Sequence, residues 1–201
     1  MRIEYMDIVL RDYKREDIED DIRWMTVETA WSDWDAPWET KRDIRTFDQD
    51  EFTKKALKRL SARKNDHDFR WAFEIDTKDG VHIGGVNCYL NDKEFNWKSR
   101  SEGGCLHTLG IEICESSYWY KGLGTQAFAA FIQYYLSRGI DDLYTETWSG
   151  NDPMIAVAEK LGFEVCRVDE NYRKVNGKLY DGLIFKLNVE KFHDYLNNLI
   201  I

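Results

Sequence analysis

Residues 118–125 of the chain, Tyr-Trp-Tyr-Lys-Gly-Leu-Gly-Thr, are of types and spacing that could bind phosphate. An apolar run at residues 109–114 precedes them and reads as a strand, and apolar side chains follow at helical spacing. A turn from a strand into a helix gathers free backbone N–H groups at the positive end of the helix dipole. Gly122 and Gly124 allow close approach of a ligand, and Lys121 adds a cation. The sequence therefore predicts a phosphate-binding turn.

This turn matches neither of two common phosphate-binding motifs. It lacks the Gly-Lys-Ser/Thr that follows four variable residues in nucleotide-hydrolysing loops. It also lacks the third glycine of a dinucleotide fingerprint. A Gly-x-Gly taken alone favours an ordinary tight connection between a strand and a helix, so the surrounding residues must decide.

Carboxylates in two predicted strands are candidates for proton transfer. Glu112 alternates with Ile111 and Ile113, so it faces the opposite side of its strand from them. It could act as a general base or simply face solvent, and the sequence leaves both open. Glu146, in the next strand, is a second candidate base. Cys114 could act as a nucleophile, although a buried thiol is the usual state of such a cysteine.

A segment between the first two predicted helices is rich in tryptophan and carboxylate side chains. Acidic groups with aromatic walls suit an ammonium group through charge and cation–π attraction. Tryptophans also commonly pack a core or an interface, and this alternative stays open. The residues concerned are Trp24, Trp31, Trp34 and Trp38 with Glu28, Asp33, Asp35 and Glu39.

Composition limits the classes of partner. The 201 residues, 43% of them hydrophobic, suffice for one domain with an ample core. The formal net charge of −9 argues against nucleic acid, because binding phosphates requires a basic surface. The same charge favours a cationic small substrate through long-range attraction.

The sequence predicts neither a membrane partner nor a metal. No apolar run is long enough to span a bilayer, and residues 1–11 lack the apolar centre of a signal peptide. The cysteines, Cys88, Cys105, Cys114 and Cys166, form no Cys-x-x-Cys pair, so we expect free thiols and a cytoplasmic protein. The histidines show no zinc-binding spacing.

The elements that must position these residues alternate between strands and helices, which predicts a mixed α/β sheet. Asp152 is the expected N-cap of one helix and Gly162 its stop, and Asn176-Gly177 is an expected turn. Residues 31–38 and 91–102 are expected loops. The expected strands are 3–11, 71–75, 81–86, 109–114, 143–148, 163–168 and 183–187. The expected helices are 14–29, 48–62, 123–139 and 152–162, and a short helix ends at Leu196.

Two further stretches make the glycine turn specific. They are Glu146-Thr147-Trp148-Ser149-Gly150-Asn151 and Ala158-Glu159-Lys160-Leu161-Gly162-Phe163. Together with the turn they resemble the GNAT superfamily of acyl-CoA-dependent N-acetyltransferases. The form Trp-x-Lys-Gly-x-Gly-Thr, and Val9-Leu10-Arg11-Asp12 before a helix, look most like the branch of the ribosomal-protein N-terminal (alanine/serine) acetyltransferases. The resemblance covers about residues 8–188.

The resemblance implies one acyl-CoA N-acyltransferase domain over residues 1–201, with a centrally splayed mixed sheet flanked by helices on both faces. Acetyl-CoA, the acyl donor, would lie beside the strand that ends at Cys114. Asn151 would contact it from the neighbouring helix, unless that residue is a plain helix N-cap. The pyrophosphate would bind the backbone N–H groups of Lys121, Gly122, Leu123, Gly124 and Thr125, and Ile113 and Cys114 would offer backbone groups to the pantetheine arm.

The implied reaction is direct attack of an amine on the thioester. Glu112 would take the ammonium proton, and a backbone N–H near Cys114 would stabilise the oxyanion. The general acid stays unassigned, because Ala158 lies where many GNAT enzymes have tyrosine. The expected acceptor is a primary amine, namely a polyamine, an aminoglycoside-like amine or a protein N-terminus, and the protein could form a homodimer.

Two other functions are compatible with the same residues. A non-catalytic acyl-CoA-binding or regulatory domain would keep the cofactor site and lack turnover, as Ala158 and the unproven base allow. A nucleotide-binding enzyme could use the same turn, but no metal-binding carboxylate stands beside a nucleotide-type loop.

Overall fold

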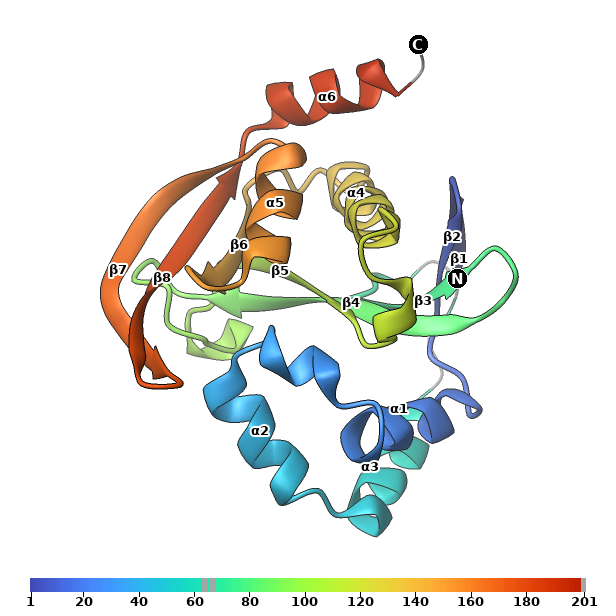
Figure 1. Ribbon diagram of the computed structural model, residues 1–201. Coiled ribbons are helices and arrows are strands. Elements are labelled where there is room, and N and C mark those ends of the chain that lie inside the picture. The colour runs from blue at the N-terminus through green and yellow to red at the C-terminus, as the bar shows by residue number, and fades with distance from the viewer. Residues whose placement is uncertain (63–64, 66–67, 200–201) are drawn as a thin grey trace. The chain divides into compact units, whose positions relative to one another are not determined.

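The structure is a computed structural model that describes residues 1–62, 65 and 68–199 (Figure 1). The strands are β1 Arg2–Tyr5, β2 Ile8–Arg11, β3 Ala72–Thr77, β4 His82–Asn91, β5 Leu106–Ile113, β6 Leu143–Trp148, β7 Phe163–Val175 and β8 Lys178–Leu187. The α-helices are α1 Asp17–Thr26, α2 Pro37–Arg45, α3 Gln49–Ser61, α4 Leu123–Leu136, α5 Asp152–Lys160 and α6 Val189–Asn198. Short 3-10 helices are η1 Ala30–Asp33, η2 Arg100–Glu102 and η3 Ser116–Tyr118.

The strands form one mixed sheet in the order β1-β2-β3-β4-β5-β6-β8-β7. The β5–β6 pair is parallel, whereas the β1–β2, β2–β3, β6–β8 and β7–β8 pairs are antiparallel. The predicted mixed α/β class is therefore confirmed. The chain divides into a first unit of residues 1–86 and 111–130 and a second unit of residues 87–110 and 131–201. The expectation of a single domain over residues 1–201 stays a prediction.

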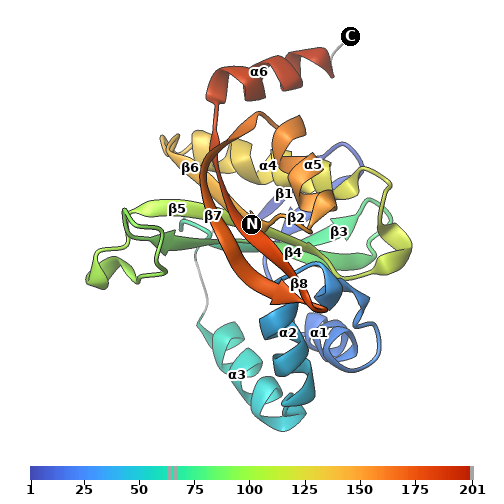
Figure 2. The same ribbon diagram turned by 60° about the vertical axis from the view of Figure 1, so that its left-hand side comes forward.

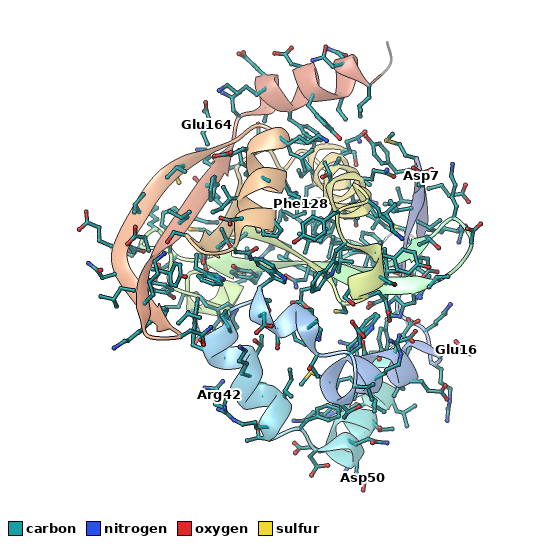
Figure 3. All side chains as sticks on the ribbon, viewed as in Figure 1. Asp7, Glu16, Arg42, Asp50, Phe128 and Glu164 are labelled. Carbon is teal, nitrogen blue, oxygen red and sulfur yellow. The ribbon has the colours of Figure 1, made fainter. Side chains whose placement is uncertain are left out.

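In the first unit, strands β1 to β3 and helices α1 to α3 lie together (Figures 1 and 2). Its core contains Ile8 and Leu10 of β2, Phe73 and Ile75 of β3, and Phe128 of α4, all of them buried. Figure 3 shows Phe128 inside the molecule, and labels Asp50 on the outside of the helical layer. Strand β2 is buried along its whole length, whereas in β3 the buried Phe73 and Ile75 alternate with the less buried Ala72 and Glu74.

The second unit contains β6, β8 and β7, with β7 and β8 forming a long hairpin (Figure 2). Asn176 and Gly177 join the two strands with φ of 48° and 86°, as the sequence predicts for a two-residue turn. Helix α5 ends before Gly162, whose φ of +85° is the left-handed conformation expected of a helix stop. Strands β7 and β8 are both longer than predicted. Much of β7 is exposed and charged, so its outer part lacks the apolar pattern by which a strand is predicted.

Several expected boundaries are wrong for local reasons. The expected strand 3–11 is a hairpin, because Met6 has a φ of 49° and turns the chain between β1 and β2. Helix α1 begins at Asp17 rather than residue 14, and ends at Thr26. Helix α2 begins inside the expected loop, with Pro37 in its first turn, and extends to Arg45. It was not predicted because its charged sequence shows no clear helical pattern of apolar residues. Asn151, not Asp152, caps α5.

Among the described residues, no helix is both long and apolar enough to cross a bilayer.

Candidate active site

The glycine turn leads from η3 into α4 through two left-handed residues. Tyr120 has a φ of 58° and Gly122 a φ of 78°, so the chain reverses within three residues. The carbonyl oxygen of Gly122 accepts the first helical hydrogen bond, from the N–H of Gln126 at 3.1 Å. The ammonium group of Lys121 lies 5.0 Å from the ring centre of Tyr118. The predicted strand–turn–helix arrangement is therefore present.

The turn exposes a run of unpaired donors. Within the described part of the chain, no acceptor takes a hydrogen bond from the backbone N–H groups of residues 121–125. These are the donors that the start of a helix leaves free, and they lie at the positive end of the helix dipole. A Cβ on Gly122 would meet no atom within 4 Å, so this side of the turn is open. The turn therefore fits a diphosphate group.

The end of β5 lies directly beside this turn. A Cβ on Gly124 would lie 3.5 Å from Cγ1 of Ile113 and 3.9 Å from Cδ1 of Ile111. Both isoleucines are only partly buried, although they are large apolar side chains. The indole Nε1 of Trp119 donates to the carbonyl oxygen of Ile113 at 2.7 Å. An elongated apolar and amide-bearing group could therefore run along this strand toward the turn.

The expected oxyanion donor near Cys114 is already used. The backbone N–H of Cys114 donates to the carbonyl oxygen of Ile83 at 2.8 Å. Burial raises the pKa of the Cys114 thiol well above its usual value, and the charge of Glu112 adds to this effect. Because the thiolate is the nucleophilic form, Cys114 is suited to packing rather than to acyl transfer.

Strands β4 and β5 approach closely at Gly84. Its φ is +154°, and a Cβ there would lie 2.0 Å from the carbonyl oxygen of Glu112. Only glycine allows this approach, because any side chain would overlap the backbone of β5. Gly84 therefore fixes where the backbone of Glu112 lies.

Glu112 does not simply face solvent. Glu112 is only partly exposed, and the carboxyl group of Asp35 interacts with it electrostatically. Burial raises the pKa of Glu112 to about 8, and the negative charges of Asp35, Glu74 and Asp21 act in the same direction. A carboxyl group in this range exchanges its proton near neutral pH, which suits a general base.

Glu112 belongs to an acidic cluster, which we define as Asp21, Asp35, Glu74 and Glu112. The phenol of Tyr13 donates to Oδ2 of Asp21 at 2.6 Å, and burial raises the pKa of Asp21 to about 6. Burial also raises the pKa of Asp35. The cluster combines residues from α1, the η1–α2 loop, β3 and β5, so its members are distant in sequence. The sequence analysis names Asp35 and Glu112 but not Asp21 or Glu74. A lone glutamate in the apolar strand around residue 74 is the sequence signal that could have found Glu74.

His82 supports the cluster from β4. Its Nε2 lies 3.2 Å from Oε2 of Glu74, and its Nδ1 lies 3.0 Å from Oδ2 of Asp20. Although burial opposes a charge there, the hydrogen bond with Glu74 and the charge of Asp17 raise the pKa of His82. The ring of Trp24 packs against the ring of His82, with 4.7 Å between the ring centres. The sequence predicts no role for His82, because its partners Asp20 and Glu74 come from other elements of the fold.

The described residues contain one group of three possible metal ligands, Asp17, Asp20 and His82. Arg11 donates to both carboxylate oxygens of Asp17 at 2.6 and 2.8 Å, and to Oδ2 of Asp76 at 2.6 Å. Charge in this group is thus balanced by side chains of the protein itself. The arrangement joins α1 to β2, β3 and β4.

Two side chains of the tryptophan-rich segment form hydrogen bonds within the first unit. Nε1 of Trp24 donates to Glu115 at 2.7 Å, and Nε1 of Trp31 donates to the carbonyl oxygen of Trp24 at 2.9 Å. Asp33 forms an exposed ion pair with Lys41 at 2.6 Å. Of the residues predicted for the acceptor, the structure brings Asp35 directly to Glu112.

Two predicted site residues belong to the second unit. Asn151 accepts a hydrogen bond from the N–H of Met154 at 3.2 Å and so caps α5. Glu146 is hydrogen-bonded to Asn91 and Tyr89, and burial raises its pKa to about 7. Ala158, where many GNAT enzymes have tyrosine, is completely buried.

The fold and the glycine turn define an acetyltransferase of the GNAT class. A family model described as an acetyltransferase (GNAT) domain matches residues 7–164, so the chain belongs to this family. The predicted resemblance, the enzyme class and the use of acetyl-CoA are thereby confirmed. No protein of curated function matches the sequence.

Solved structures share this fold over nearly the whole chain. A GNAT-family acetyltransferase from Bacillus anthracis has a TM-score of 0.64 at 15% identity, covering 93% of this chain and 98% of its own. RimL, a ribosomal L7/L12 α-N-protein acetyltransferase solved with coenzyme A, has a TM-score of 0.66 at 17% identity, covering 92% and 97%. An acetyltransferase from Salmonella typhimurium that modifies the N-terminal serine of L7/L12 has a TM-score of 0.62 at 16% identity, covering 90% and 94%. At these identities the likeness shows the fold.

Proposed function

We propose that this acetyltransferase moves the acetyl group of acetyl-CoA to a primary amine, with Glu112 as the general base. The observation that carries the proposal is the juxtaposition within the first unit of the open N–H groups at residues 121–125 and the end of β5, which bears Glu112. A cofactor held by the turn and lying along β5 would present its thioester near this carboxyl group.

The chain's own residues supply the cofactor contacts in this proposal. The backbone N–H groups of Lys121, Gly122, Leu123, Gly124 and Thr125 bind the pyrophosphate, and the side chain of Lys121 adds charge. Ile113 and Cys114 offer backbone groups to the pantetheine arm, with the Cys114 N–H already engaged by Ile83. Asn151 contacts the cofactor in addition to capping α5. Residues 1–201 act as one catalytic domain.

The proton balance assigns a role to Glu112. The acceptor arrives as an ammonium ion and gives one proton to the carboxylate. The neutral amine forms the new N–C bond, and its nitrogen then loses a second proton to solvent. The C–S bond breaks, and the sulfur leaves with the electron pair and takes a proton from solvent. The proton on Glu112 then returns to solvent, so the carboxylate is restored for the next turnover.

The acidic cluster favours a cationic acceptor. Its four carboxyl groups, with Glu39 acting on Asp35, attract an ammonium group and repel an acidic one. A polyamine, an aminoglycoside-like amine and a protein N-terminus all satisfy this requirement. The fold shared with RimL, named as an L7/L12 α-N-protein acetyltransferase, supports the N-terminus as one member of the panel to test. Free cysteines support a cytoplasmic location, and a homodimer is part of the proposal.

Isothermal titration with acetyl-CoA, followed by thiol release with an amine panel, tests the proposal. The panel contains spermidine, an aminoglycoside and a peptide with an N-terminal serine. Binding with thiol release that depends on one amine class is the expected result. Binding without release by any amine would favour the alternative, a non-catalytic acyl-CoA-binding domain. If ATP bound with an affinity equal to that of acetyl-CoA and displaced it, the result would instead favour a nucleotide-binding enzyme.

A further inference from the structure

The side chain of Tyr120 extends into solvent from the glycine turn. It is 85% exposed, more than any other large apolar side chain in the described part of the chain. Among the described residues, it takes part in no hydrogen bond, ion pair or ring contact. Its two neighbours differ, because the ring of Tyr118 lies against the ammonium group of Lys121 and Trp119 donates to the carbonyl oxygen of Ile113. The ring of Tyr120 therefore lies outside the packing of the fold.

The backbone at Tyr120 has a conformation that favours glycine. Its φ is 58°, and a residue with a Cβ carries strain in this left-handed region. Phe95, another aromatic residue with a positive φ of 63°, packs its ring 5.4 Å from the ring of Tyr144. Such a contact can offset the strain, and Tyr120 has none with the described residues. A strained residue with an exposed ring is typical of a ligand-binding position.

The two ends of the turn differ in their surroundings. A Cβ on Gly124 would lie 3.5 Å from Cγ1 of Ile113, so this end packs against β5. A Cβ on Gly122 would meet no atom within 4 Å, and Tyr120 belongs to this open end. The diphosphate of coenzyme A joins the pantetheine arm to an adenosine group. If the arm runs along β5 from the Gly124 end, the adenosine leaves the turn at the open end.

We propose that the ring of Tyr120 binds the adenine base of acetyl-CoA by stacking on its face. This rests on the proposed function, which places the diphosphate on the backbone N–H groups of residues 121–125. Only one ribose separates the diphosphate from the base, and Tyr120 directly precedes the first of these donors. Stacking removes the faces of the ring and the base from water and adds dispersion attraction. Because no described residue contacts the ring, it can turn to lie parallel to the base.

Isothermal titration of the full chain with two ligands tests this contact. Acetyl-CoA carries the adenine, whereas S-acetyl phosphopantetheine carries the same thioester and arm with one phosphate and no adenosine. Tyr120→Ala keeps the Cβ and removes the ring, so the Kd of acetyl-CoA should rise at least about fivefold, as expected for the loss of one stacked base. The Kd of the truncated ligand should not change. Tyr120→Phe, the matched control, keeps the ring and should bind both ligands as the wild type does.

The melting temperature separates a binding role from a structural one. Tyr120→Ala should melt at the wild-type temperature, because the ring packs against no described residue. A clear fall would show that the ring serves the fold, and would overturn the proposal. Tyr120→Gly, which relieves the left-handed strain, replaces the alanine variant in the titrations should that variant not fold.

The titrations distinguish failure of the contact from failure of the proposed function. An unchanged Kd of acetyl-CoA in Tyr120→Ala, or an equal rise in Kd for both ligands, would overturn the adenine contact. A ring-dependent Kd of acetyl-CoA without thiol release from any amine would support the contact and refute the proposed transfer. Absence of acetyl-CoA binding by the wild type would overturn both.

Discussion

The dependence of turnover on pH follows directly from the environment of Glu112. With a pKa of about 8, the ionised fraction of Glu112 is about one in a hundred at pH 6, about one in ten at pH 7 and about nine in ten at pH 9. Only the ionised form can take the ammonium proton. The kcat at saturating acetyl-CoA should therefore rise about 90-fold between pH 6 and pH 9 and level off above pH 8.

The assay is continuous detection of free thiol with a saturating acceptor whose amine has a pKa of about 10, such as a lysine-type amine. With such an acceptor, levelling of kcat near pH 8 reports the titration of a group on the enzyme and not of the substrate amine. Glu112→Gln should lower kcat by about 10² to 10⁴ and remove the inflection, because it deletes the base and retains the shape. Binding of acetyl-CoA should change little.

Two results would refute this reasoning. A wild-type profile without an inflection between pH 7 and pH 9 would show that no group with the proton affinity of Glu112 controls the rate. A Glu112→Gln enzyme that keeps the wild-type inflection would assign it to another group. Glu146, whose pKa is raised to about 7, would then be the first residue to replace.

Other predictions concern the turn and the supporting residues. Gly124→Glu should abolish binding of acetyl-CoA in calorimetry. Gly124→Ala should fold normally, since its Cβ would lie at an ordinary contact distance of 3.5 Å from Ile113. Equal affinities of the glutamate variant and wild type would contradict the phosphate site. Gly122→Glu should lose stability as well as binding, because its φ of +78° strains any side chain, and a melting temperature equal to wild type would argue against this. Gly84→Ala should cost about 3 kcal/mol in urea unfolding, and a loss below half of that would mean that β4 and β5 can separate locally. The folded-state pKa of His82 is raised, so its stabilisation is fully present below the unfolded pKa and is lost as pH rises through the folded value; His82→Gln should remove that pH dependence from the unfolding free energy.

Much of the site could be predicted from local sequence because its parts are contiguous. The unpaired N–H groups at residues 121–125 require only a glycine turn before a helix, and both signals lie within one short segment. The stop at Gly162 and the turn at Asn176-Gly177 are equally local. Each depends on left-handed backbone that glycine and asparagine adopt at low cost.

The boundaries that could not be predicted show competition between local and tertiary preferences. Met6 adopts a left-handed conformation where the register of β1 on β2 places Tyr5 opposite Ile8, and the turn contains Asp7 but neither glycine nor asparagine. The charged sequence of α2 carries no clear helical periodicity, yet the helix forms behind Pro37 with Thr40 buried in it. In both places packing decides the conformation.

By itself the sequence determined the class of the protein, the mixed α/β fold and the glycine turn that begins α4, because motif and periodicity are local properties of the chain. Only the tertiary structure decided the state of Glu112. From the sequence, Glu112 could equally be a general base or a solvent-facing residue. Strand alternation fixes the face of the sheet on which a side chain lies, but not the side chains that cover that face. The structure covers that face with Asp35, Asp21 and Glu74, from segments 38 to 91 positions away. Burial and like charges change the proton affinity only when such distant segments meet.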